Sequence, residues 1–206
     1  MGGHLMSTIS SSTTSTTAYK VTADTTGTLV LQTGATPTTA MTIDASQNTT
    51  LAGTLATSSR GITKASMPAG SVLQVVNATF SNQINTSSAT YIDTGLTASI
   101  TPTSSTSKIM CFVDMVGVGK DTNNAYVGFK LLRGATVIVT FELQAGWTNS
   151  SASIDIGSCS TNYLDSPATT SATTYKVQYS NVTAVGNAYA QISGPTSTIT
   201  LMEIAV

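Results

Sequence analysis

The sequence predicts an all-β protein, and three observations support that prediction. Serine and threonine together supply 67 of the 206 residues, an unusually polar and uncharged composition. Only 8% of residues are charged, so the helix formers Glu, Lys and Arg are scarce, while β-branched Thr, Val and Ile are abundant. Several runs alternate apolar and polar residues, which is the period of a strand with one buried face.

Residues 125–131 and 137–143 each alternate in this way, so each range predicts a strand with one buried face. Arg133 and Gly134 lie between the two ranges, and a glycine supplies the positive φ that a tight turn needs. We therefore expect a hairpin here.

Residues 109–118 form the most apolar run, which we expect to be a strand of the same sheet as that hairpin. The run is apolar on both faces and is interrupted only by Asp114, which predicts that both faces are covered. One cover would be the second sheet of a sandwich, and the other a neighbouring subunit. The polar stretch that follows, residues 120–124, is expected to be a hairpin turn.

The composition divides the chain into four parts. Residues 1–18 are a Ser/Thr-rich arm that we expect to be disordered unless a partner binds it. Residues 19–57 are expected to form a small β-rich stalk or attachment region, and residues 58–70 a linker. Residues 71–206 are expected to form the C-terminal domain.

The predicted stalk contains very little apolar surface. Its short β-like units contribute only pairs of apolar residues, such as Leu29 with Leu31 and Met41 with Ile43. That is too little to hold a monomeric domain together, but three copies around a common axis would share one core. The sequence therefore predicts a homotrimer.

Residues 71–206 contain eight or nine short apolar runs separated by polar turns. This pattern is typical of an antiparallel β-sandwich, jelly-roll-like in its strand number. Besides the three strands above, strands are expected over residues 72–76, 96–100, 153–164, 175–179, 188–193 and 198–206, with a short one at residues 91–94. In the last of these the apolar phase switches between Leu201 and Met202, which predicts either a bulge or burial on both faces at a trimer axis.

The sequence disfavours several classes of function. A net charge of −1 with scattered basic residues disfavours nucleic-acid binding. No run approaches the roughly 18 apolar residues of a membrane-spanning helix, and the N-terminus lacks the pattern of a signal peptide. The single histidine, His4, leaves no nucleophile–His–acid triad, and no His/Cys cluster suits zinc. We expect no enzymatic activity, no cofactor and no metal.

Three sets of residues leave alternatives open. Two of Asp114, Asp155 and Asp165 would have to converge for glycoside cleavage, and nothing in their spacing indicates this. Asp121 and Asn123 are expected to belong to a turn, although they are also candidate Ca²⁺ ligands in a loop with too few acids. Cys111 and Cys159 are expected to be buried thiols, and a disulfide between them is not testable from spacing.

Trp147, the only tryptophan, marks the candidate receptor-binding loop AGWTNSS. An indole on a polar loop suits the flat apolar face of a sugar, with Asn149 and Ser150 bonding its hydroxyls. The alternative is that Trp147 folds back onto the end of the sandwich or into a subunit interface. Aromatic candidates of the same kind are Tyr163, Tyr126 and Tyr189.

The run TTAYKVTADTTGTLVLQTGATPTTAMTIDASQN, within residues 16–53, resembles the Thr-rich segments of fibre-like structural proteins of tailed bacteriophages. The opening GSVLQVV and the ending STITLMEIAV are similar to the globular tips of such fibres. The resemblance implies a non-enzymatic virion structural protein, a homotrimeric tail fibre exposed on the particle. Its expected partners are other virion proteins and a host-surface glycan or protein receptor. The alternatives are a capsid decoration fibre and a glycan-degrading tailspike.

Overall fold

The computed structural model describes residues 28–33, 38–52, 67–149 and 154–206, so the predicted arm at residues 1–18 and most of the predicted linker lie outside it. The chain divides into two compact units, Met1–Gly61 and Ile62–Val206. The described residues form strands and turns and no helix, which confirms the all-β class. A search of the same residues for a helix able to cross a membrane finds none.

The described part of the first unit is a three-stranded antiparallel meander. Its strands are β1 (Leu29–Thr33), β2 (Thr38–Ile43) and β3 (Thr49–Leu51), paired in the order β1-β2-β3. Asp44 fixes the turn after β2, because its carboxylate accepts 2.9 Å bonds from the backbone N–H groups of Ser46 and Asn48. The side-chain amide of Asn48 donates a further bond of 3.0 Å. Hydrogen bonds from Asn48 and Ser46 hold the pKa of Asp44 below its ordinary value.

One face of this meander is apolar. Side chains that lie directly opposite each other on paired strands share a face. Leu29 pairs with Ile43, and Met41 pairs with both Leu31 and Leu51. All five are only partly buried or exposed, with Leu31 at 44% and Leu51 at 42%. Within the described part of this unit, nothing covers the apolar face.

The second unit is a jelly roll of two packed antiparallel sheets. Its strands are β4 (Val72–Phe80), β5 (Ile84–Thr86), β6 (Ile92–Ile100), β7 (Lys108–Lys120), β8 (Val127–Arg133), β9 (Thr136–Ala145), β10 (Ile154–Asp165), β11 (Thr173–Asn181), β12 (Ala188–Ala190) and β13 (Ser197–Ile204).

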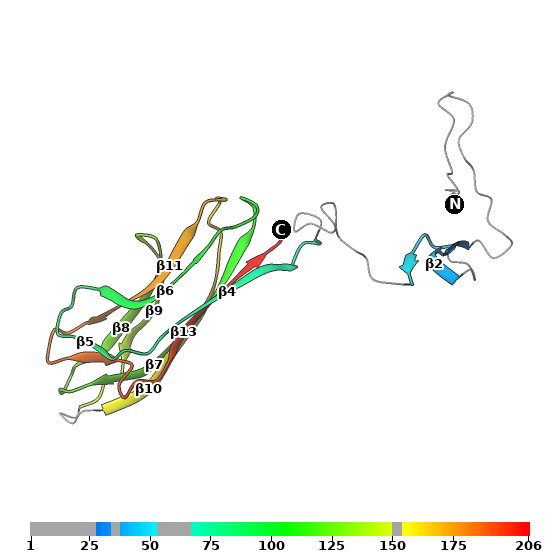
Figure 1. The fold of residues 1–206 in the computed structure, drawn as a ribbon. Helices are drawn as coiled ribbons and strands as arrows, with labels where there is room; N and C mark the ends of the chain where they lie inside the picture. The colour runs from blue at the N-terminus through cyan, green and yellow to red at the C-terminus, as the bar shows by residue number, and fades with distance from the viewer. Residues whose placement is uncertain (1–27, 34–37, 53–66, 150–153) are drawn as a thin grey trace, which may run out of the picture. The chain divides into compact units, whose positions relative to one another are not determined.

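The strand order defines the jelly roll. One sheet runs β4-β13-β7-β10, with β12 and β5 added beside the far end of β7, and the other sheet runs β6-β11-β8-β9. Counted along the chain, the eight long strands are arranged 1-8-3-6 in one sheet and 2-7-4-5 in the other. This is the double Greek key of a jelly roll. Figure 1 shows β4, β13, β7 and β10 as one layer and β6, β11, β8 and β9 as the other. The predicted β-sandwich is confirmed.

The core lies between the two sheets. Alternate residues of β7, from Ile109 to Met115, face inward and are fully buried. From the opposite sheet, Tyr175, Val177 and Tyr179 of β11 point toward them, as the alternation in residues 175–179 predicts.

The expectation that residues 109–118 share a sheet with the following hairpin is wrong. β7 belongs to the sheet of β4 and β13, whereas β8 and β9 belong to the other sheet. The turn at residues 121–124 is therefore a crossing between sheets and not the expected hairpin turn. The error has a physical cause, since hydrophobic period reports which faces are buried but not which strands pair.

The predicted β8–β9 hairpin is confirmed, with Gly134 at a φ of 58° in its turn. The expected single apolar face of β9 is only partly formed. Register shifts along the β8–β9 pairing break the alternation, and Val137 and Leu143 are exposed. Phe141 still packs inward and stacks on Phe129, with ring centroids 5.6 Å apart.

The described chain covers only one face of β7. The outward residues Met110 and Val116 are half-buried, and Phe112 is 42% exposed. The second cover, expected from a neighbouring subunit, stays a prediction.

The phase switch at the end of the chain comes from a buried glutamate. Ile199, Leu201 and Glu203 all face inward on β13, and a register shift against β4 follows at Glu203/Ile204. The Glu203 carboxylate accepts bonds from the backbone N–H and the hydroxyl of Thr103, at 2.6 and 2.7 Å, and from Gln74 Nε2 at 2.6 Å. Burial raises the pKa of Glu203, but the bonds from Thr103 and Gln74 outweigh it and leave the pKa below its ordinary value.

Cys111 and Cys159 are free thiols. Cys159 pairs with Met115, four residues along β7 from Cys111, so the two cysteines lie about 13 Å apart. A disulfide needs Cα atoms within about 7 Å. Burial raises the pKa of Cys111 to about 12 and that of Cys159 to about 11, so both behave as inert thiols.

Candidate functional site

The predicted receptor-binding loop follows β9 and contacts the turn where the chain crosses from β7 to β8. Asp121 organises this end of the jelly roll. Its carboxylate accepts bonds from the backbone N–H and the side-chain amide of Asn187, both at 2.7 Å, from Thr122 Oγ1 at 2.9 Å and from the Tyr189 hydroxyl at 3.0 Å. These contacts tie the crossing turn to β12.

The same contacts bear on Asp121 as a candidate Ca²⁺ ligand. Both carboxylate oxygens of Asp121 are already occupied by protein donors. Burial raises the pKa of Asp121, but the bonds from Asn187, Thr122 and Tyr189 outweigh it and lower the pKa to about 2. Among the described residues, no three of His, Cys, Asp and Glu group together as metal ligands. The geometry gives Asp121 a structural role in the turn.

Lys120, at the end of β7, anchors the predicted receptor-binding loop through a hydrogen bond to its backbone. Its side chain is 1% exposed, and its Nζ donates a 2.9 Å bond to the backbone carbonyl of Thr148. The backbone N–H of Asn124 donates to the same carbonyl at 3.4 Å, and that of Trp147 donates to Gln144 at 3.2 Å. The short segment at residues 147–149 is therefore held against the crossing turn.

This anchoring leaves Trp147 outside the core. The indole is 56% exposed and Asn149 is exposed beside it, while Ser150 lies outside the described residues. Within the described chain, Trp147 does not fold back to plug the end of the sandwich. Its place in a contact with a receptor or with another subunit stays a prediction.

Tyr163 is not part of this loop. It pairs with Cys111, whereas the start of β10 pairs with Lys120, so Tyr163 lies about 30 Å along the strand from the anchored loop. Its side chain packs against the core. The structure therefore brings Trp147 and Asn149 together and separates Tyr163 from them.

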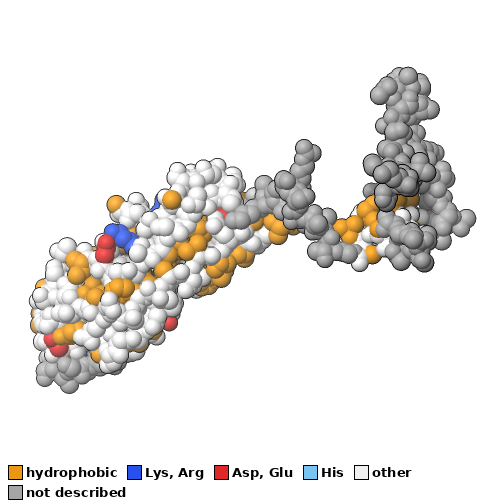
Figure 2. Space-filling view, viewed as in Figure 1, with side chains coloured by type: hydrophobic (Ala, Val, Ile, Leu, Met, Phe, Trp, Pro, Cys, Tyr) orange, Lys and Arg blue, Asp and Glu red, His pale blue; other side chains and the backbone are white. Residues whose placement is uncertain are grey.

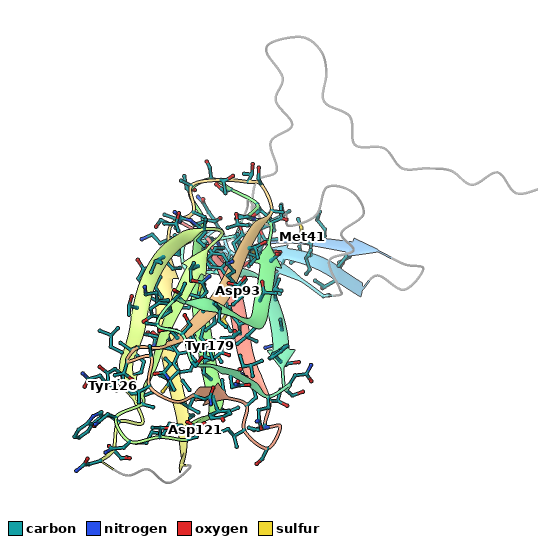
Figure 3. All side chains as sticks on the ribbon, turned by 90° about the vertical axis from the view of Figure 1, so that its left-hand side faces the viewer. Met41, Asp93, Asp121, Tyr126 and Tyr179 are labelled. Atoms are coloured by element: carbon teal, nitrogen blue, oxygen red, sulfur yellow. The ribbon has the colours of Figure 1, made fainter. Side chains whose placement is uncertain are left out.

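The two other tyrosine candidates lie at the same end as Trp147. Tyr189 donates its hydroxyl to Asp121. Figure 3 shows Tyr126 and Asp121 at one end of the jelly roll, Tyr179 in the interior and Asp93 toward the other end. Tyr126 is half-buried, and its backbone carbonyl accepts a 3.2 Å bond from Val182.

Of the three acids weighed for glycoside cleavage, the two with described side chains do not converge. Asp165 faces the core, where both of its oxygens bond to Arg133 and one accepts the Tyr175 hydroxyl. Asp114 faces outward on β7, so the sheet separates it from Asp165. The side chain of Asp155 lies outside the described residues.

Sequence reasoning did not find a second feature, a depression on the outer face of the sheet β4-β13-β7-β10. It has a volume of about 300 Å³ and is lined by outward side chains of three neighbouring strands, chiefly Phe112, Asp114, Ser160, Asn162 and Thr198. The one sequence signal for it was Asp114, the single acid in an otherwise apolar run. Its neighbours on β10 and β13 are distant in sequence, so only the strand register brings them together.

The fold and the site define a protein built on a jelly-roll domain with a solvent-exposed loop end. No protein-family model matches the chain, and no curated protein matches it in sequence. Among solved structures, the chain is similar to the VP2 subviral particle of infectious bursal disease virus, with 13% identity and a TM-score of 0.43 over 64% of this chain and 32% of that one. A structure of the Gt strain of the same virus matches with 11% identity and a TM-score of 0.38, over 65% of this chain and 38% of that one.

The chain thus spans only about a third of the length of those two structures. At TM-scores this low the likeness carries no argument about function. The fold assignment rests on the strand order described above.

Proposed function

We propose that the protein is a non-enzymatic structural protein of a virion, a homotrimeric fibre exposed on the particle surface. Its meander belongs to the stalk, and its jelly roll is the tip. The observation that carries this proposal is the apolar face of the β1–β3 meander, which no other described residue covers and which is formed by Leu29, Leu31, Met41, Ile43 and Leu51.

A meander of this size does not hold together alone. Small sheets in water need a packed apolar face, and the described part of this unit offers no second layer. Asp44, in the turn, is the single ionisable residue of residues 28–33 and 38–52, so little charge repulsion opposes close packing of copies. Three copies around one axis cover all three apolar faces at once.

The proposed receptor contact is the loop end of the jelly roll. Trp147 and Asn149 are exposed there on a segment anchored by Lys120, and Ser150 follows them. An exposed indole next to an amide suits a host-surface glycan or protein. Three tips on one fibre and many fibres on one particle raise the avidity of a weak contact. Tyr163 is best treated as a core residue of this tip, because its side chain packs inward.

A tail fibre is the first candidate because residues 16–53 resemble segments of phage fibres. A capsid decoration fibre is the second candidate, because a jelly-roll strand order is also an architecture of capsid domains. Fold alone does not choose between the two.

A matched pair of substitutions tests the trimer. Leu31 and Val30 are neighbours on β1 with equal exposure of 44%, but they lie on opposite faces of the meander. Leu31→Thr places a hydroxyl in the proposed shared core and is expected to lower the native mass measured by light scattering. Val30→Thr lies on the opposite face and is expected to leave the trimer intact. Equal native masses for the two variants and the wild type would count against the meander as the trimer contact.

A labelling experiment separates the two candidates. Fluorescent protein that stains host cells, with the staining lost in Trp147→Ala, supports a receptor-binding tail fibre. Protein that coats particles lacking it, and leaves cells unstained, supports a decoration fibre. Binding to neither would contradict the virion assignment.

A further inference from the structure

The outer face of the sheet β4-β13-β7-β10 has a defined arrangement of side chains around two residues of β7. Phe112 and Asp114 are successive outward residues of that strand. The residues paired with them on the two flanking strands all carry a hydroxyl or an amide: Thr198, Thr200, Ser160 and Asn162. An aromatic ring and a carboxylate are thus surrounded by neutral hydrogen-bonding groups on rigid strands.

All of these residues except Thr200 line the depression of about 300 Å³, hereafter the Phe112 depression. That volume lies at the lower end of the range of about 300 to 1,000 Å³ found for small-ligand sites. Phe112 is 42% exposed, although large aromatic side chains usually bury most of their surface. Figure 2 shows few charged side chains on the face that it displays, where hydrophobic side chains lie among uncharged side chains and backbone.

Three polar side chains of the depression are not used by the protein. Among the described residues, the side chains of Asp114, Ser160 and Asn162 take part in no hydrogen bond or ion pair. Other acids of the jelly roll are satisfied, as Asp121, Asp165 and Glu203 each accept several bonds. Asp114 is therefore an acceptor on a preformed surface, without a donor from its own chain.

We propose that the Phe112 depression binds an uncharged saccharide. The Phe112 ring offers a flat apolar surface to the C–H face of a sugar. The Asp114 carboxylate accepts hydrogen bonds from sugar hydroxyls, and such bonds to a charged acceptor are stronger than neutral ones. Asn162, Ser160 and Thr198 supply further donors and acceptors. The charge of Asp114 disfavours acidic sugars, so the site selects neutral ones.

A second copy of the chain fits this depression less well. Packing another protein surface here would remove the unpaired Asp114 carboxylate from water, and a buried charge without a partner is costly. A small polyhydroxylated ligand brings the missing donors and leaves the carboxylate partly hydrated. The proposal rests on the proposed fibre role in one respect, that the sheet face is exposed on the particle.

The test uses the full-length protein and a small panel of oligosaccharides. Binding of the neutral chitotriose, maltotriose and galactobiose, and of the acidic 3′-sialyllactose and trigalacturonate, is measured by saturation-transfer NMR and calorimetry. We expect at least one neutral sugar to bind and neither acidic sugar to do so. No binding of any neutral sugar overturns the proposal, as does equal binding of neutral and acidic sugars.

Three variants place the binding at the depression. Phe112→Ser is expected to lower the affinity for the neutral sugar about tenfold, in line with the value of an aromatic contact. Asp114→Asn keeps a hydrogen-bonding group of the same shape but is expected to lower that affinity and to weaken the discrimination against acidic sugars. Val137→Ser, which changes an exposed apolar side chain on the other sheet, is the control and is expected to change nothing. Unchanged binding in both Phe112→Ser and Asp114→Asn overturns the proposal.

Native mass and thermal melting are recorded for every variant. A fall in native mass in Phe112→Ser or Asp114→Asn identifies the face as a subunit interface and contradicts the saccharide site. Sugar binding by a protein that proves monomeric leaves the site standing and refutes the fibre. A trimer that binds no neutral sugar refutes the site and leaves the fibre standing.

Discussion

The Tyr175 hydroxyl donates a 2.6 Å hydrogen bond to the Asp165 carboxylate in the interior of the jelly roll. Tyr175 lies on β11 of one sheet and Asp165 on β10 of the other, so the bond joins the two layers. Arg133 of β8 completes the arrangement with contacts of 2.8 and 2.9 Å to both carboxylate oxygens. Burial, together with the bond to Asp165, raises the pKa of the Tyr175 hydroxyl, so it remains a donor at all ordinary pH values.

The two donors to Asp165 are expected to differ in their effect on stability. Tyr175→Phe removes one bond to a charged acceptor and should cost about 1–2 kcal/mol of unfolding free energy. Arg133→Met removes the cation from a buried carboxylate and should cost about 3 kcal/mol or more. Urea unfolding measures both, and an equal or smaller loss for Arg133→Met would contradict the pairing.

Loss of the Glu203 carboxylate, near the C-terminal end of β13, should lower the stability of the jelly roll. Glu203→Ala leaves the three donor groups of Thr103 and Gln74 without their acceptor, at an expected cost of about 2–4 kcal/mol. Glu142→Ala is the control, since its carboxylate bonds only to nearby backbone N–H groups of an edge strand and should cost under about 1 kcal/mol. Similar melting temperatures for the two variants would show that the buried network has no special weight.

The lowered pKa of Asp121 predicts a specific acid dependence. Its pKa is about 2 in the folded chain against an ordinary value of 3.8, so its contribution is fully present above pH 3.8. That contribution is lost as the pH falls from about 3.8 through about 2, where the folded-state carboxylate is protonated. Asp121→Asn should therefore be less stable than the wild type at pH 6, and the difference should shrink toward pH 2. A difference independent of pH would contradict the hydrogen-bonded arrangement.

Gly95 should tolerate no side chain. Its φ is 90°, and a Cβ at this position would lie 2.6 Å from the ring of Phe80. Gly95→Ala is expected to lower the melting temperature by at least several degrees through both effects. Gly134→Ala, at a φ of 58° but with open space around it, separates the two causes. It should be destabilised by backbone strain alone, and thus less than Gly95→Ala.

Local pattern in the sequence was enough to predict the class, the β8–β9 hairpin and the inward row of β11. The pattern did not predict which strands pair with β7, because the apolar residues of β7 indicate burial but not the neighbouring strand. For the same reason, the sequence pattern suggested a loop around Trp147 but did not reveal the Phe112 depression, whose parts come from β7, β10 and β13. The buried Glu203 appeared in the sequence only as a break in apolar phase, since its partners Gln74 and Thr103 are about 100 or more residues away.

The native mass of the full chain distinguishes the proposed homotrimer from a monomer. Sedimentation equilibrium over a range of concentrations separates a stable trimer from a weak association. A trimer with a shared stalk core would give a single species of about 63 kDa, three times the 21.1 kDa chain, that persists on dilution. A single species of about 21 kDa would contradict the shared core of the stalk and, with it, the proposed fibre.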